Sequence, residues 1–105
     1  MEKLSFQLSA ARIAGGTRRQ AIVGVVASGN LEVLLERTGE SGICVVDVAT
    51  AVRGFGPVWE AVVADFVSQH ATGGLRISIN DAGARPDTVS LRLAQGLRLI
   101  GGSGG

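Results

Sequence analysis

The sequence is poor in the residues on which disulfide-rich, metal-binding and catalytic proteins depend. Its 105 residues include one cysteine, one histidine, two prolines and no tyrosine. The single cysteine, Cys44, excludes an internal disulfide, and its place in the apolar run 43–46 predicts a buried, unreactive thiol. The single histidine, His70, and the dispersed acidic residues form no metal-ligand spacing, nucleophile elbow or carboxylate pair. We therefore expect no catalytic residues and no metal.

The sequence also has no large excess of charge of one sign and no long apolar run. Ten basic and nine acidic residues give a formal net charge of +1, so the chain lacks the electrostatic footprint of a nucleic-acid or anionic-membrane binder. No apolar run approaches the roughly 20 residues that cross a bilayer. The first residues lack the apolar stretch of a signal peptide. The sequence predicts a cytoplasmic protein that binds neither nucleic acid nor membrane.

Apolar residues, by contrast, are plentiful. They make up 46% of the chain, which is enough to fill one hydrophobic core. We expect a single domain over residues 1–100. Residues 101–105, Gly-Gly-Ser-Gly-Gly, have the composition of a flexible linker, either native or added to the protein.

Segments in which apolar and polar residues alternate, or which are rich in β-branched residues, predict five strands. The predicted strands cover residues 4–8, 20–27, 31–36, 43–48 and 75–79. Only Ser28, Gly29 and Asn30 separate the second strand from the third, and Gly-Asn suits a turn with positive φ. We expect a tight hairpin there, and three consecutive strands paired as an antiparallel meander.

Two segments have the period of a helix. The first is predicted from Pro57 to His70, with Trp59 and Phe66 on its apolar face, and the second begins at Pro86. The expected fold is α+β: an antiparallel sheet of four or five strands covered on one face by two helices.

Ser28 is the candidate for a modified side chain. The hairpin tip makes its hydroxyl accessible, and the paired strands on either side hold it in place. No neighbouring base activates this oxygen, so it suits modification by another enzyme better than chemistry of its own. From the residues alone, however, a serine that only forms a turn is the commoner explanation.

Other candidates have structural explanations. The amides after the glycines of segment 54–56 could bind an anion. That segment lacks the lysine of a P-loop and the full dinucleotide fingerprint, so chain turning and helix capping are favoured. Trp59 is expected to be a core or interface anchor, and His70 to complement the C-terminal end of the helix dipole.

Three segments together resemble the acyl carrier (delta) subunit of malonate decarboxylase. Residues 23–36, VGVVASGNLEVLLE, are similar to the serine hairpin of that family. Two later segments agree with that family in order and spacing: residues 54–62, GFGPVWEAV, and residues 77–86, ISINDAGARP. The segment VSLRL at residues 89–93 follows them and agrees as well. The resemblance covers nearly all of the chain before the glycine-rich end.

The resemblance implies a non-catalytic carrier role in malonate catabolism. Ser28 would carry 2'-(5''-phosphoribosyl)-3'-dephospho-CoA, a phosphopantetheine-type arm with a terminal thiol, through a phosphodiester. A transferase subunit would exchange acetyl on that thiol for malonyl, and decarboxylase subunits would release carbon dioxide and regenerate acetyl. The nucleotidyltransferase that attaches the arm, and a malonyltransferase, would be transient partners.

Alternatives to this role come from three classes of protein. A citrate lyase-type carrier subunit uses the same prosthetic group, although the long hairpin and residues 54–59 favour the malonate system. A protein-interaction module would bind through the helical face around Trp59, with Ser28 only a turn residue. A small hydrolase using Ser28 and His70 is a weaker alternative.

The sequence departs from the family pattern close to the serine. Ala27, Asn30 and Ala82 stand where the family pattern predicts glycine, aspartate and phenylalanine. The phosphates of the arm would also need solvent or hydrogen-bond donors. Candidate donors are Arg18, Arg19, Arg53 and the amides near Gly56.

Overall fold

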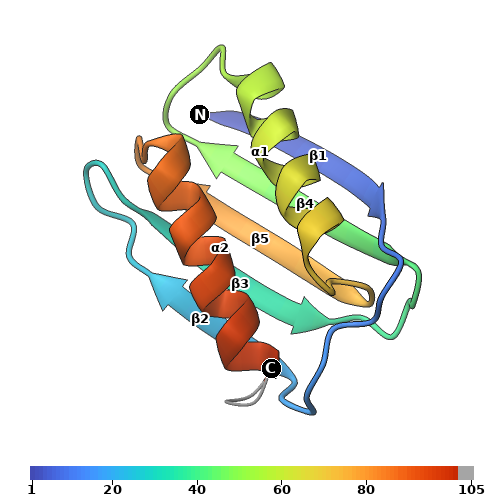
Figure 1. Cartoon of the computed structure of the whole chain (residues 1–105). Helices are drawn as coiled ribbons and strands as arrows, with labels where there is room; N and C mark the ends of the chain where they lie inside the picture. Colours follow the sequence, from blue (N-terminus) through green and yellow to red (C-terminus); the bar gives the residue numbers. More distant parts are fainter. Residues whose placement is uncertain (102–105) are drawn as a thin grey trace.

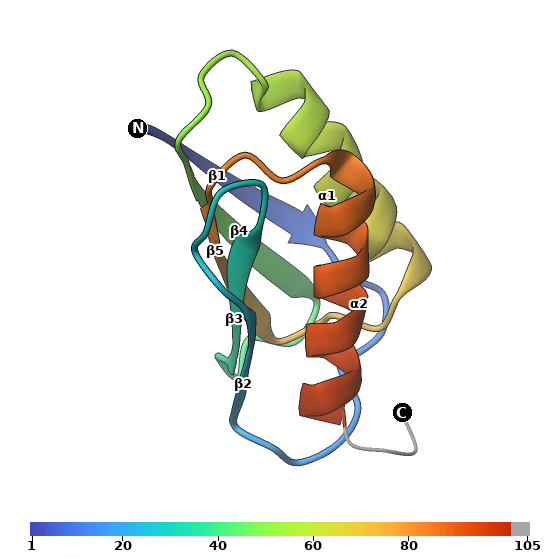
Figure 2. The same cartoon turned by 90° about the vertical axis from the view of Figure 1, so that its left-hand side faces the viewer.

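Both helices of the chain lie on one face of a five-stranded sheet (Figure 1 and Figure 2). The computed structural model describes residues 1–101. In chain order the elements are β1 (Glu2–Ser9), β2 (Gln20–Gly24), β3 (Leu31–Arg37), β4 (Ile43–Thr50), α1 (Gly56–Gln69), β5 (Leu75–Asp81) and α2 (Pro86–Gly101). The predicted α+β architecture is confirmed. Apart from Gly101, the predicted flexible segment 101–105 lies outside the described residues.

The last strand of the chain, β5, occupies the centre of the sheet, whose order is β1-β4-β5-β3-β2. It pairs in parallel with β4 and antiparallel with β3, and the two outer pairs are antiparallel. The predicted meander, in which β3 pairs with β4, is therefore wrong, and the sheet is mixed. The reason is the connection: α1 returns the chain to the level where β4 begins, so β5 must run parallel to β4.

Alternate residues of the central strands fill the space beneath the helices. Leu31, Val33 and Leu35 of β3 and Ile77 of β5 have no exposed surface. The helices contribute Trp59, Val63, Phe66 and Val67 from α1, and Val89, Leu93, Gly96 and Ile100 from α2. Burial of each large apolar side chain contributes about 1.5–3 kcal/mol, so packing stabilises the helices more than local propensity does. Neither helix within the described residues is long and apolar enough to cross a membrane.

Cys44 belongs to this buried layer. Its side chain points from β4 into the core and has no exposed surface. Burial raises the pKa of the thiol, which reduces the fraction of reactive thiolate at neutral pH. The predicted burial of Cys44 is confirmed.

A polar network around Asp47 lies on the sheet face opposite the helices. Asp47 of β4 accepts a hydrogen bond from the Ser5 hydroxyl at 2.7 Å and forms an ion pair with Arg76 at 2.6 Å. The Ser5 hydrogen bond, followed by the contact with Arg76, holds the pKa of the Asp47 carboxyl below its ordinary value. These contacts link β1, β4 and β5 across the face that has no helix among the described residues.

We predict that Asp47→Asn destabilises the fold only at pH values where Asp47 is ionised. Because the folded-state pKa is lowered, the stabilisation is complete above the unfolded-state pKa and is lost as the pH falls through the folded-state pKa. The pair is partly exposed, so the loss at neutral pH should be only about 0.5 kcal/mol. Urea unfolding of both proteins at neutral and strongly acid pH would measure it. An equal difference at both pH values would contradict the prediction.

Candidate functional site

Ser28 lies in a six-residue loop between β2 and β3, and its side chain is exposed. The hairpin is confirmed, but its predicted form is wrong, because β2 ends at Gly24 rather than Ala27. Gly24 has a φ of +82°, which turns the chain out of the ladder. The amide of Asn30 donates to the carbonyl of Ala27 at 2.8 Å, which places Ser28 and Gly29 at the centre of a β-turn.

This loop is fixed to the loop that follows β5. The Gly29 amide donates to the Ala82 carbonyl at 3.0 Å, and the Ala82 amide donates to the Asn30 carbonyl at 3.0 Å. The Asn30 side-chain oxygen accepts from the Leu31 amide at 2.8 Å and from Nε of Arg92 at 3.3 Å. Ser28 is therefore exposed on a base that is hydrogen-bonded to two other parts of the chain.

Two glycines of the loop should respond differently to alanine. A Cβ atom at Gly24 would overlap the carbonyl oxygen of Leu31, whereas a Cβ atom at Gly29 would meet no atom within 4 Å. Both residues have positive φ, which alone costs an alanine roughly 1–2 kcal/mol. We predict that Gly29→Ala costs about that much and that Gly24→Ala costs more, measured by urea unfolding. Equal losses would show that the contact with Leu31 relaxes freely.

The carboxylate of Asp81 organises the same end of the sheet. Asp81 is 5% exposed and is the last residue of β5. It accepts hydrogen bonds from the Thr50 hydroxyl at 2.9 Å and from the amides of Gly83 at 3.1 Å and Ala84 at 2.9 Å. These contacts join the end of β4 to the turn that leads into α2. The sequence signal was an Asp-Ala-Gly turn after a strand, where aspartate often accepts from the following amides.

We predict that Asp81→Asn costs about 1.5–3 kcal/mol of unfolding free energy, because an amide cannot accept all three hydrogen bonds. Thr50→Val should cost less, about 1 kcal/mol, because Asp81 keeps its two amide donors. The double variant should lose less unfolding free energy than the sum of the losses in the two single variants. Chemical denaturation of the four proteins would test this. Strict additivity would contradict a direct interaction between Thr50 and Asp81.

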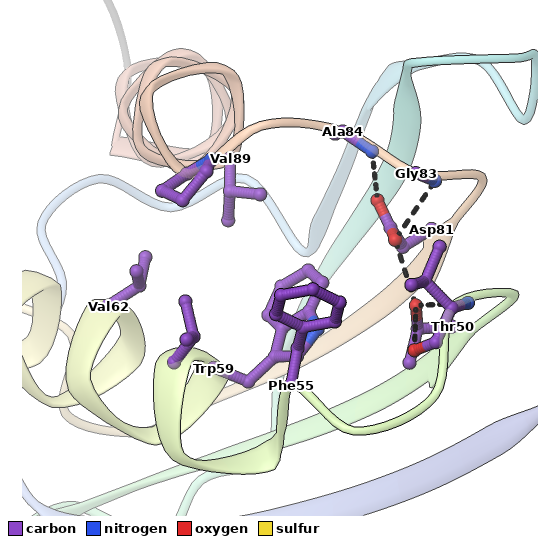
Figure 3. A pocket seen from close by; sticks show the side chains of 11 residues that line it. Thr50, Phe55, Trp59, Val62, Asp81, Gly83, Ala84 and Val89 are labelled. Carbon is purple, nitrogen blue, oxygen red and sulfur yellow. Dashed lines mark hydrogen bonds between the residues drawn. The ribbon is translucent and has the colours of Figure 1, made fainter.

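A cleft of about 360 Å³ lies beside this network, between the N-terminal turns of the two helices (Figure 3). Most of its lining is apolar, and its polar lining side chains are those of Thr50 and Asp81. Trp59 forms part of the wall and is 6% exposed, as expected for a core anchor. The apolar wall consists of Val52, Phe55, Val58, Trp59, Val62, Gly83, Ala84, Pro86 and Val89.

The other predicted site residues are divided between the two ends of the sheet. Arg53 and Gly56 lie in or just after the β4–α1 loop, at the same end as Ser28, since Thr50 pairs with Asp81 and Asp81 with Leu31. Arg92, which contacts Asn30, was not among the predicted phosphate contacts. Its 62-residue separation from Asn30 leaves no local sequence signal.

Arg18 and Arg19 lie at the opposite end. The Arg37 side chain, at the end of β3, donates to the carbonyls of Ala14, Arg18 and Ile100 at 3.1, 2.6 and 3.0 Å. Since β3 begins next to the Ser28 loop and is seven residues long, about 20 Å of strand separates Arg37 from that loop. Arg18 and Arg19 are therefore poorly placed to contact a group on Ser28.

His70 is also at that far end, because it follows the last residue of α1. Its Nδ1 lies 2.9 Å from the carbonyl oxygen of Phe66, and its ring stacks on the Phe66 ring with a centroid distance of 4.4 Å. The hypothesis of a hydrolase that uses Ser28 and His70 together is therefore wrong. Residues 1–101 contain no group of three or more His, Cys, Asp or Glu side chains that could hold a metal ion.

Fold and site together define a class of protein: a small α+β domain that presents one serine on a fixed loop, next to an apolar cleft. A family model described as malonate decarboxylase delta subunit matches residues 18–100. The chain belongs to this family.

Individual relatives agree over the whole length. The chain is 59% identical to the malonate decarboxylase acyl carrier protein of Bradyrhizobium diazoefficiens, covering 99% of each chain. It is 50% identical to that of Xanthomonas axonopodis pv. citri, covering 98% of each. A chain in the crystal structure of a Pseudomonas malonate decarboxylase hetero-tetramer in complex with malonate is 40% identical, with a TM-score of 0.82, over 96% of this chain and 100% of that one.

Proposed function

We propose that this chain is the acyl carrier subunit of a malonate decarboxylase, and that Ser28 is the attachment point of its prosthetic group. The observation that carries the proposal is the exposed Ser28 hydroxyl on a loop fixed by Ala82, in a chain whose curated relatives are named acyl carrier proteins. The malonate system is favoured over a citrate lyase-type carrier because the family model and these relatives are those of malonate decarboxylase.

The residues present fit a 2'-(5''-phosphoribosyl)-3'-dephospho-CoA group attached by a phosphodiester. An exposed hydroxyl can accept a phosphoryl group from a separate enzyme without activation by the chain itself. Arg92 and Arg53 lie at the same end of the sheet and are the candidates to complement the phosphate charges. When bound, the group supplies a thiol that carries acetyl and malonyl as thioesters.

A carrier of this kind works by tethering. A flexible link between Ser28 and the thiol replaces diffusion of a free thioester with an effective concentration that can reach the millimolar range. The task of the protein is then to keep the base of the arm in a defined place, which the hydrogen bonds of Gly29 and Asn30 to Ala82 do. No side chain of the carrier has to make or break a bond of the acyl group.

The proposal extends to the setting of the subunit. Residues 1–100 form a single acyl-carrier domain that works in the cytoplasm. Its stable partners are the transferase and decarboxylase subunits, and a nucleotidyltransferase and a malonyltransferase act on it transiently. The similarity to a chain of the Pseudomonas hetero-tetramer supports the assembly with other subunits.

Intact mass spectrometry tests the attachment. We predict that the subunit isolated with its native partners carries the mass of the prosthetic group, and that Ser28→Ala abolishes both this mass increase and malonate decarboxylation. Ser41→Ala is the matched control, because Ser41 is also exposed in a turn but lies at the opposite end of β3. It should keep both properties.

Circular dichroism should show the same fold in all three proteins, because neither serine is buried. An unmodified mass in an active complex would refute the proposal and leave the protein-interaction alternative. A mass increase that persists in Ser28→Ala would place the attachment on another residue.

A further inference from the structure

The carrier role does not by itself account for the cleft between α1 and α2. Three large apolar side chains at its mouth remain substantially exposed: Val52 at 40%, Phe55 at 49% and Val58 at 42%. Exposed apolar side chains are common singly, but three that line one concave site are typical of a binding site. At about 360 Å³ the cleft is large enough for a small organic group.

The rim of this cleft is the same segment that holds the Ser28 loop. Ala82 exchanges hydrogen bonds with Gly29 and Asn30, and the next two residues, Gly83 and Ala84, line the cleft. Two residues of extended chain span at most about 7 Å. A long flexible group attached to Ser28 therefore starts within a few residues of the cleft, and tethering gives it a high local concentration there.

The chemistry of the lining discriminates between the two acyl groups of the proposed function. An acetyl thioester is uncharged and would gain from contact with Trp59 and Val62. A malonyl thioester carries a free carboxylate, which would lose water against the apolar wall and meet the Asp81 carboxylate. The donors around Asp81 are already engaged by its own oxygens, so they are not available to the second carboxylate.

We propose that this cleft is a resting site for the acetyl-bearing end of the arm on Ser28, and that it excludes the malonyl form. The inference rests on the proposed function. The acetyl thioester is shielded between partner encounters, and exchange of acetyl for malonyl releases the arm toward the decarboxylase subunits.

Thioester cleavage by hydroxylamine tests the shielding on the isolated, fully modified carrier. Burial of one methyl-sized group shifts an equilibrium about four-fold, so we expect the acetyl thioester to be cleaved about four-fold more slowly than free acetyl-pantetheine. The malonyl thioester on the carrier should be cleaved as fast as free malonyl-pantetheine. A carbon-13 acetyl label should also show contacts between its methyl group and the Trp59 indole.

The variant Val58→Trp fills the mouth of the cleft from a partly exposed helix position, so it should remove the protection without unfolding the protein. Val26→Trp is the matched control: Val26 is 54% exposed and lies two residues from Ser28, but it does not line the cleft. It should keep the protection.

Intact mass of each sample separates the possible failures. If the arm is attached but acetyl is cleaved as fast as free acetyl-pantetheine in the wild type and both variants, the resting site is refuted and the carrier role stands. Equal protection in all three would place the shielding elsewhere, and equal protection of malonyl would refute the selectivity. Absence of the arm from an active complex would refute both proposals.

Discussion

The hydrogen bonds to the buried Asp81 carboxylate are the interactions that organise the end of the sheet next to the Ser28 loop. A carboxylate removed from water is costly unless donors surround it, and here the Thr50 hydroxyl and the amides of Gly83 and Ala84 fill that role. The backbone of Asp81 is engaged as well, since its carbonyl accepts from the Ala51 amide at 3.0 Å. One residue thus defines where the chain leaves β4 and how it turns from β5 into α2.

The mixed topology of the sheet is what brings these loops together. Because β4 and β5 are parallel neighbours, their carboxyl ends share one edge of the sheet, and the loops into α1 and α2 both leave from it. Because β3 is antiparallel to β5, the loop between β2 and β3 arrives at the same edge. In a simple meander of β2, β3 and β4, the neighbour of β3 would be β4 rather than the strand that leads into α2.

Local patterns predicted most of the elements and little of their assembly. The predicted helix 57–70 differs from α1 by one residue at each end, and the predicted strand 43–48 lies within β4. Alternation of apolar residues identifies a strand but does not say which strand lies beside it, so the central place of β5 was missed. The early end of β2 at Gly24 was missed because the apolar run continues through Ala27, and nothing in that run indicates the positive φ of Gly24 or its close approach to the Leu31 carbonyl.

The sequence also points unevenly to the residues of the candidate site. Ser28 was singled out by a resemblance along the chain, because the physics of a turn serine is unspecific. Asp81 belongs to the dispersed acidic residues, and its buried hydrogen bond with Thr50 joins residues 31 positions apart, so no local pattern indicates it. The cleft has no linear signature, since its lining comes from β4, β5, both helices and two loops.

The departure at Asn30 acquires a physical meaning in this setting. Its side-chain oxygen accepts from the Leu31 amide and from Arg92, and either an amide or a carboxylate oxygen can accept both hydrogen bonds. Asparagine therefore preserves the geometry that aspartate would give. It differs in charge: the two side chains that accept from Arg92, those of Asn30 and Gln95, are both neutral. The hydrogen bonds of the guanidinium to these side chains therefore include no carboxylate, and this would favour the proposed phosphodiester on Ser28 more than an aspartate at position 30 would.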